Sequence, residues 1–282
     1  MRLEWTRLPD FLIWPGLVLL GIAVGAYGTM VGVGGGFLLV PVLLLIYPSE
    51  SPDVITSISL AVVLVNALSG TVAYVRQQRI DFLAGNAFAA ATVPGAILGA
   101  FATGAFPRRL FDLIFSLALI GLSLLLALRP VPRVASRRGR TGEVTRQITD
   151  SQGDTYFYSY NLRLGTGLSI GIGFIAGFLG IGGGVVHVPM MVQVLHFPAH
   201  IATATSQYVL TFTSAAATFT HLLGGEYASG LGRIGALAVG VFVGAQGGAW
   251  LSMRVRGPML VRLLSLALGA VGLRLLIGAV LG

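Results

Sequence analysis

The sequence contains neither cysteine nor lysine, and it has few charged residues of any kind. Without cysteine, the chain can form no disulfide and no thiolate metal site, and it cannot use a cysteine nucleophile. Charged side chains make up 10% of the 282 residues and hydrophobic ones 55%, whereas an average soluble domain is about 25% charged. So few charges cannot cover a soluble surface. We therefore expect an all-α integral membrane protein with the lipid bilayer as a partner.

All 18 basic residues are arginine, and the formal net charge is +8. The arginines gather in the connections between apolar stretches, as they do in membrane proteins, where basic loops set the orientation of the spans. This distribution argues against a basic face for nucleic acid. We expect no nucleic-acid partner.

A glycine-rich motif occurs twice, as GVGGGFLLVP from Gly32 to Pro41 and as GIGGGVVHVP from Gly180 to Pro189. Its four glycines and its proline recur at a constant offset of 148 residues, so the chain is an internal repeat. Consecutive glycines allow a tight turn and a close approach of the backbone to a ligand. A phosphate-binding loop is excluded, because neither motif is followed by lysine and serine or threonine.

Ten hydrophobic segments fall into two sets of five, and the second segment of each set is short. They are Phe11–Val33, Phe37–Tyr47, Val54–Val75, Phe82–Ala105 and Leu110–Leu128, then Leu164–Ile181, Val185–Phe197, Ile201–Leu223, Ile234–Ser252 and Met259–Leu281. Crossing the hydrocarbon takes about 20 helical residues. The short segments cannot cross it, so each glycine turn should lie inside the membrane.

The placement of arginine predicts that both termini are outside, with residues 1–129 as a first membrane repeat and residues 164–282 as a second. Residues 130–163 form a polar, arginine-rich linker, which we expect on the cytoplasmic side. Arg108 and Arg109 contradict this assignment, because it puts them outside. An odd number of segments per repeat inverts the second repeat relative to the first, and such repeats place a substrate site at their interface near the midplane.

We expect this site between the two glycine turns, where the N-termini of the short helices would attract an anion. The candidate ligands are backbone N–H groups, hydroxyls and amides close to the motifs in both repeats. They are Gly34, Gly35, Gly36, Gly182, Gly183 and Gly184 in the turns, and Ser57, Ser59, Asn66, Thr205, Ser206 and Gln207 in the helices that follow. The competing interpretation is that the glycines only turn the chain and the hydroxyls bond back to their own helices.

His187 lies three residues after Gly184, in the first turn of the second short helix. An ionisable residue inside the membrane is a functional candidate, and protonated His187 would add a positive charge beside the anion. Only His196 and His200 are spaced as metal ligands on a helix, and Pro198 stands between them. We predict no metal site, no cofactor and no catalytic residue.

The duplicated GxGGGxxxxP motif, together with the pairs Gly95/Gly99 and Gly244/Gly248, resembles the TauE/SafE family of sulfite and organosulfonate exporters, also called the toluene sulfonate uptake permeases. The resemblance spans nearly the whole chain except the linker. It implies a secondary transporter of sulfite, sulfoacetate or related organosulfonates, acting in export. We expect the two glycine pairs to be helix contacts, because small residues four apart let helices approach closely.

The sequence therefore predicts a multi-pass protein of the bacterial cytoplasmic (inner) membrane that carries a small anionic substrate. The alternative is a transporter of another small organic anion, such as a carboxylate. A membrane enzyme would need a nucleophile with a base or a metal cluster, and the histidines provide neither. Whether the chain forms a homodimer is left open.

Overall fold

The computed structural model describes residues 10–47, 50–128, 143–224 and 230–281, and it confirms the predicted helical membrane fold. The first repeat contains α1 (Asp10–Met30), α2 (Gly36–Ile46), α3 (Pro52–Arg76), α4 (Phe82–Thr103) and α5 (Arg108–Leu128). The second contains α6 (Leu162–Leu179), α7 (Gly184–Pro189) continued by the π-helical turn η2 (Met190–Val194), α8 (Ala199–Leu223), α9 (Leu231–Ser252) and α10 (Gly257–Leu281). The arginines from 129 to 140, Arg2 and Arg7 lie outside the described residues.

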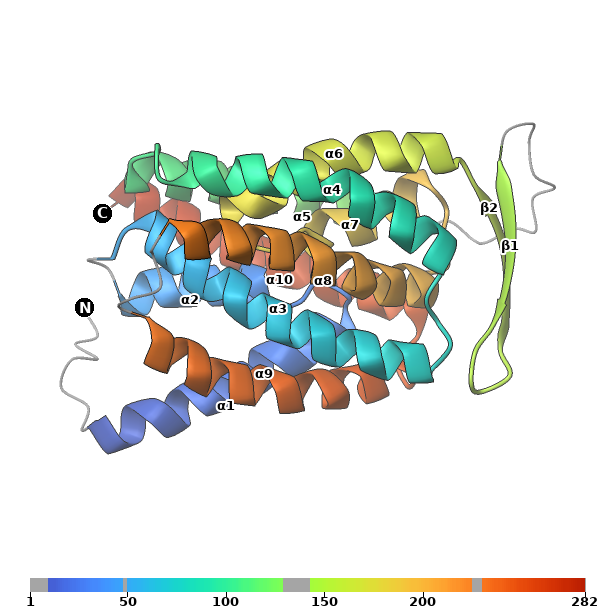
Figure 1. Ribbon diagram of the computed structural model, residues 1–282, viewed down its shortest axis with the longest axis horizontal. Helices are drawn as coiled ribbons and strands as arrows, with labels where there is room; N and C mark the ends of the chain where they lie inside the picture. Colours follow the sequence, from blue (N-terminus) through green and yellow to red (C-terminus); the bar gives the residue numbers. More distant parts are fainter. Residues whose placement is uncertain (1–9, 48–49, 129–142, 225–229, 282) are drawn as a thin grey trace.

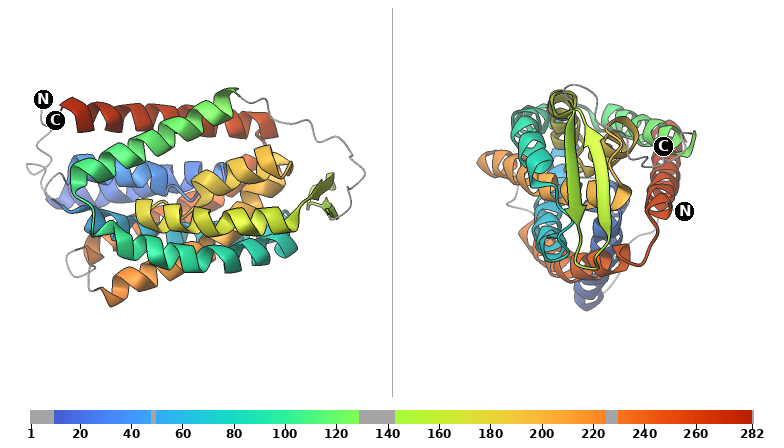
Figure 2. Two further views of the ribbon diagram at one scale, coloured as in Figure 1. Left: turned by 90° about the horizontal axis from the view of Figure 1, so that it is seen from above. Right: turned by 90° about the vertical axis from the view of Figure 1, so that its right-hand side faces the viewer.

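The helices lie side by side in one bundle, with the start of α1 and the end of α10 at one end, called here the terminal end (Figure 1). Helix α1 begins at the terminal end and α6 begins at the opposite end, so the two repeats run in opposite directions (Figure 1). Helices α3 and α8 lie between the pair α1–α9 and the pair α4–α6, while α5 and α10 pack together along one side (Figure 2).

Seven of the described helices are long and apolar enough to cross a membrane, and α8 is not among them. Helix α8 has 25 residues, or about 37 Å at the usual helical rise, so its length is sufficient. Its hydropathy is low because it carries buried polar residues such as Thr203, Thr205, Ser206 and Gln207. The most polar long helix therefore lies inside the bundle, where other helices shield it from lipid.

The predicted helix contacts at the glycine pairs are present. A Cβ on Gly95 or Gly99 of α4 would collide with backbone atoms of α6, and a Cβ on Gly244 or Gly248 of α9 would collide with the backbone of α1. The same pair of positions thus joins the fourth helix of each repeat to the first helix of the other. Without side chains at these positions, the helix backbones come into direct contact.

The linker contains an element that was not predicted from the sequence, a two-stranded antiparallel hairpin of β1 (Val144–Thr149) and β2 (Thr155–Tyr160). It lies across the end of the bundle opposite the terminal end, called here the hairpin end (Figures 1 and 2). Residues alternate between exposed and less exposed along both strands. In the sequence, strands of only six residues in a polar segment could not be distinguished from an irregular linker.

The arginines on the described connections lie where the predicted topology puts them. Arg76, Arg79 and Arg254 lie at the hairpin end, which we expect to face the cytoplasm, and Arg108 lies at the terminal end. Arg108 has a structural reason to be there, because its guanidinium donates to the carbonyls of Leu44 (2.7 Å) and Glu50 (3.0 Å), at and just beyond the C-terminus of the short helix α2. Arg108 caps the C-terminal end of α2. The position of α2 therefore determines on which side of the membrane Arg108 lies, and Arg108 gives no information on the orientation of the protein.

Cysteine labelling tests this topology in a chain with no native cysteine. Ser151 is exposed at the hairpin end, and Ala105 is exposed in the connection between α4 and α5 at the terminal end. In right-side-out vesicles, a membrane-impermeant maleimide should label Ala105→Cys and should label Ser151→Cys only after permeabilisation. The reverse pattern would show that the protein has the opposite orientation.

Alanine substitution tests the helix contacts. Gly248→Ala should lower the free energy of unfolding by about 1–3 kcal/mol, the usual cost of overpacking, because its methyl group would lie against the backbone of Ala26. Its neighbour Gly247 provides the control, since nothing lies within 4 Å of a Cβ there. Thermal unfolding in detergent compares the two variants, and equal stability would refute the packing role.

Candidate functional site

The two glycine turns have the same backbone conformation. Gly32, Gly34 and Gly35 have φ angles of 79°, 76° and 82°, and Gly180, Gly182 and Gly183 have 69°, 74° and 99°. These values lie in the left-handed region that glycine enters without strain and other residues rarely adopt. The repeated sequence motif therefore encodes a repeated backbone geometry, with Gly35 and Gly183 as the N-caps of α2 and α7.

The turns pack directly on each other, as the sequence predicts. A Cβ on Gly36 would lie 2.9 Å from Cα of Ile181, and a Cβ on Gly184 would lie 2.7 Å from Cα of Val33. The contact is reciprocal, each short helix starting against the turn of the other repeat. The N-termini of α2 and α7 therefore meet inside the bundle.

The start of each short helix has N–H groups for which the described residues provide no acceptor. They belong to Gly35, Gly36 and Phe37 in the first turn and to Gly182, Gly183, Gly184 and Val185 in the second. All seven residues are buried. A buried N–H group without an acceptor is unfavourable, so this part of the molecule can bind a group rich in acceptor oxygens.

Aliphatic side chains occupy the space beside two of the predicted ligands. A Cβ on Gly34 would lie 3.2 Å from Val63, and a Cβ on Gly182 would lie 2.7 Å from Val63 and 3.4 Å from Leu210. Val63 and Leu210 are at equivalent positions of α3 and α8. Added side chains at Gly34 and Gly182 would therefore meet these aliphatic groups. The two residues differ in their N–H groups, because that of Gly34 donates to the Gly28 carbonyl at 3.1 Å and that of Gly182 has no acceptor among the described residues.

The predicted hydroxyl ligands differ in their surroundings. Ser59 Oγ donates to the carbonyl of Gly180 at 2.8 Å, so it supports the second turn. Ser57 Oγ donates to its own helix at Val54, and Thr205 Oγ1 accepts from the N–H of Asp81. Ser206 Oγ is buried without a partner among the described residues. Of these four hydroxyls, Ser206 is thus the best candidate for a ligand, because Ser57, Ser59 and Thr205 already have other partners.

Asn66 and Gln207 belong to a buried polar cluster between α1, α3 and α8. Thr29 Oγ1 donates to Asn66 Oδ1 at 3.2 Å and accepts from Gln207 Nε2 at 3.3 Å, and Tyr74 donates to the Thr29 carbonyl at 2.7 Å. Asn66 Nδ2 has no partner within the described part of the chain. Thr29 is not among the predicted ligands, and its signal in the sequence was the one serine or threonine of an apolar helix, three residues before the first glycine motif.

His187 lies beside the second turn, as predicted, and is completely buried. Its Nε2 is 3.3 Å from Ser169 Oγ, which itself donates to the Gly165 carbonyl. When the Ser169 hydroxyl donates to the Gly165 carbonyl, it accepts from Nε2–H, and Nδ1 of that neutral tautomer is an acceptor. Nδ1 lies 3.4 Å from where a Cβ on Gly183 would be, so in this tautomer His187 donates to an anion there only when it is protonated.

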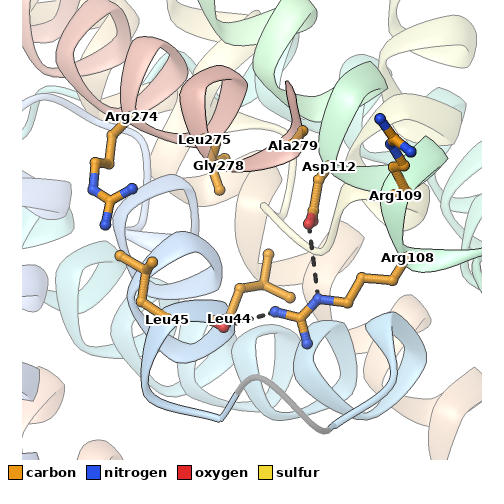
Figure 3. Close-up of a pocket in the computed structure, with 9 residues that line it drawn as sticks. All are labelled: Leu44, Leu45, Arg108, Arg109, Asp112, Arg274, Leu275, Gly278 and Ala279. Carbon is orange, nitrogen blue, oxygen red and sulfur yellow. Dashed lines mark hydrogen bonds and ion pairs between the residues drawn. The ribbon is translucent and has the colours of Figure 1, made fainter. Parts of the chain in front are cut away.

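A separate cleft of about 500 Å³ opens at the terminal end between α2, α5 and α10. Figure 3 shows Arg108 and Asp112 turned toward each other there, 3.7 Å apart, and Arg274 reaching toward α2. Arg108 is already engaged as the cap of α2. The cleft includes none of the predicted ligands, and in the described ranges no group of three histidine or acidic side chains is arranged to hold a metal ion.

Comparison with known proteins indicates the family of this chain independently of the geometry of the site. The family model described as Sulfite exporter TauE/SafE matches residues 17–275. A probable membrane transporter protein of Bacillus subtilis, YunE, is 29% identical over 266 residues, covering 92% of this chain and 96% of its own. Probable membrane transporter proteins of Haemophilus influenzae and Methanocaldococcus jannaschii are 26% and 23% identical, covering 86% and 98% of this chain and 87% and 99% of their own. No solved structure matches.

Substitution of Gly183 tests whether an anion binds at the turns. Gly183→Ala adds a methyl group whose nearest neighbours are the side chains of Ala176 at 3.1 Å and His187 at 3.4 Å, so the fold should tolerate it at a cost of about 1–2 kcal/mol for the left-handed backbone. Anion binding should fall at least tenfold, measured by ligand-induced thermal stabilisation. Gly171→Ala, where a Cβ meets nothing within 4 Å, is the control. Unchanged binding in Gly183→Ala would place the anion elsewhere.

Proposed function

The chain belongs to the sulfite exporter TauE/SafE family and is a membrane transporter, and on this basis we propose that it exports small sulfur-containing oxyanions across the bacterial cytoplasmic membrane. The substrates we propose are sulfite, sulfoacetate and related organosulfonates. The transport is secondary, by movement of the two repeats relative to each other around a shared site.

The observation that carries this proposal is the contact between two glycine turns whose buried N–H groups lack acceptors among the described residues. A sulfonate or sulfite group presents three oxygens in a tetrahedral or pyramidal arrangement. Donors that converge from two helix N-termini can bond to several of these oxygens at once. A planar carboxylate has only two oxygens and would leave more of the donors unpaired.

The neighbouring polar groups are suited to complete the site. Asn66 Nδ2 and Ser206 Oγ are buried donors without partners in the described part of the chain, and Ser59 holds the second turn in place. None of these groups carries a full charge. Binding through N–H and hydroxyl dipoles alone is weaker than binding to arginine, which suits a transporter that must release its substrate.

The proposed direction of transport and the proposed membrane rest on the arginine distribution and on the family description. If the arginine-rich hairpin end faces the cytoplasm, an exporter must take up its substrate there and release it at the terminal end. The terminal end carries the acidic residues Glu50 and Asp53 next to Arg108 and Arg233.

Matched pairs of ligands that differ only in the head group test the proposed substrate. Purified protein should be stabilised against heat by methanesulfonate more than by acetate, and by sulfoacetate more than by malonate, because a ligand that binds only the folded state raises its apparent stability. A ligand at one hundred times its Kd should add about 2.7 kcal/mol. Counterflow of radiolabelled sulfite in proteoliposomes then tests transport. Larger stabilisation by the carboxylate of each pair would refute the proposed substrate class.

A further inference from the structure

The hairpin between the repeats is attached to the first repeat by a set of polar contacts. The N–H of Ser151 donates to the Gln77 carbonyl at 3.0 Å, and Tyr158 donates to Asp81 at 2.7 Å. Asp81 is buried and is the N-cap of α4, where it accepts from two backbone N–H groups. Arg146 of β1 lies 3.4 Å from the same carboxylate. The hairpin is therefore held on the loop between α3 and α4.

The same hairpin also packs on the second repeat. The rings of Tyr158 and Tyr160 lie 4.8 and 4.5 Å from Phe197, and Tyr156 lies 6.4 Å from His200, centroid to centroid. Phe197 and His200 are at the start of α8. The hairpin thus bridges the two repeats at this end, and the repeats cannot separate here until the hairpin leaves at least one of them.

A fully buried ion pair lies at the tip of the hairpin. Arg79 donates from Nε and Nη2 to Asp150 Oδ2 at 2.9 and 2.7 Å, and the side chains are 2% and 0% exposed. Asp150 Oδ1 accepts from the N–H groups of Gln152 and Asp154. Burial would raise the pKa of the Asp150 carboxyl, but the Arg79 guanidinium and these N–H groups outweigh it and lower the pKa.

A buried ion pair adds little stability over well-packed apolar side chains, because both charges must be removed from water. An ion pair is better suited than an apolar pair to a contact that opens, because water solvates the two separated charges more favourably than it solvates two apolar side chains. Arg79 Nη1 has no partner within the described residues and is buried, so the guanidinium can bond to more oxygens than the hairpin supplies. The site fits a larger oxyanion at least as well as it fits Asp150.

Polar groups connect Arg79 with the first glycine turn. The backbone N–H of Arg79 donates to the Tyr74 carbonyl at 3.3 Å, and the Tyr74 hydroxyl donates to the carbonyl of Thr29. Thr29 in turn bonds to Asn66 and Gln207, and the N–H of Gly32 donates to its carbonyl at 3.0 Å. Arg79 is therefore at the outer end of a buried polar path that reaches the proposed site.

We propose that Arg79 is an anion-binding residue of the transport route at the hairpin end, and that Asp150 is an internal carboxylate that occupies it while this end is closed. When the hairpin leaves, Arg79 receives the transported anion. The inference rests on the proposed function in requiring that an anion crosses the protein, whatever its head group.

A charge swap separates this role from simple anchoring. The double variant Arg79→Asp with Asp150→Arg restores an ion pair in the same place but puts a negative charge on the route. It should fold, with a lower unfolding temperature because the N–H groups of Gln152 and Asp154 lose Asp150 Oδ1 as their acceptor, and it should transport at least tenfold more slowly. The control swaps Arg233 with Glu50, an ion pair at the terminal end that also joins the repeats at 3.0 Å and is one-quarter exposed, and should leave transport within twofold of the wild type.

Transport by the Arg79/Asp150 swap at the wild-type rate would overturn the proposal, because it would show that Arg79 only holds the hairpin. If the swapped pair does not fold, the neutral pair Arg79→Gln with Asp150→Asn provides the same comparison without leaving a buried unpaired charge. It should transport at one tenth of the wild-type rate or less. A neutral pair with wild-type transport would equally overturn the proposal.

A disulfide tests whether the hairpin must move. Gln77→Cys with Ser151→Cys joins the hairpin to the bundle at an existing backbone contact, whereas Thr149→Cys with Thr155→Cys closes the hairpin on itself at a cross-strand pair. Oxidation of the first variant should reduce transport at least tenfold, reversibly with dithiothreitol, and oxidation of the second should not. Full transport by the oxidised first variant would refute the opening step.

The two proposals fail in different ways. Wild-type protein that carries a carboxylate and no sulfonate would refute the proposed substrate, and the charge swap would then be measured with that carboxylate. Normal sulfonate transport by the swapped variant would refute the role of Arg79 and leave the proposed substrate standing.

Discussion

Backbone polar groups cannot be left facing the hydrocarbon of a bilayer, and the interior of this transporter is arranged around that constraint. Each repeat interrupts a helix at a glycine turn, and each turn is covered by the turn of the other repeat, with Gly36 against Ile181 and Gly184 against Val33. The long helices α3 and α8 pack beside these turns. At the outer end of α2 the carbonyl of Leu44 is paired by Arg108. The interrupted helices are stable only because the two repeats pack together.

The fold could be predicted largely because the glycine motif determines backbone conformation directly. Left-handed φ angles at Gly35 and Gly183 are accessible to glycine and costly for other residues, so a repeated motif implied a repeated turn. Apolar segment lengths then gave the helices. The hairpin escaped prediction because β1 and β2 have six residues each, and what stabilises them is contact with Asp81 and Phe197, which are remote in sequence. Arg108 likewise looked like an exception to the topology because its partners on α2 could not be known.

The side chains of the site were harder to predict than its backbone. A serine or threonine in a helix can bond to its own preceding turn or to another helix, and the sequence does not distinguish the two. Ser57 takes the first course and Ser59 the second, although they are two residues apart. Helical periodicity explains the difference afterwards, since two residues along a helix turn the side chain by about 200°. Which face meets the other repeat became clear only when α3 was placed against the second turn.

The two glycine turns share a backbone conformation, but the side chains around them differ. His187 of α7 corresponds to Leu39 of α2, and Asn66 of α3 corresponds to Thr213 of α8. On the proposed function, turns of like conformation give an oxyanion N–H donors from both repeats whichever end of the protein is open. Unequal side chains make the two open states differ in free energy, because a ligand shifts an equilibrium only through different interactions in its two states. The hairpin adds to this inequality, because it contacts Arg79 and Asp81 of the first repeat and Phe197 of the second, and it does so at one end of the bundle. Two glycine turns of like conformation with unlike side chains around them are thus a physical basis for a preferred resting state.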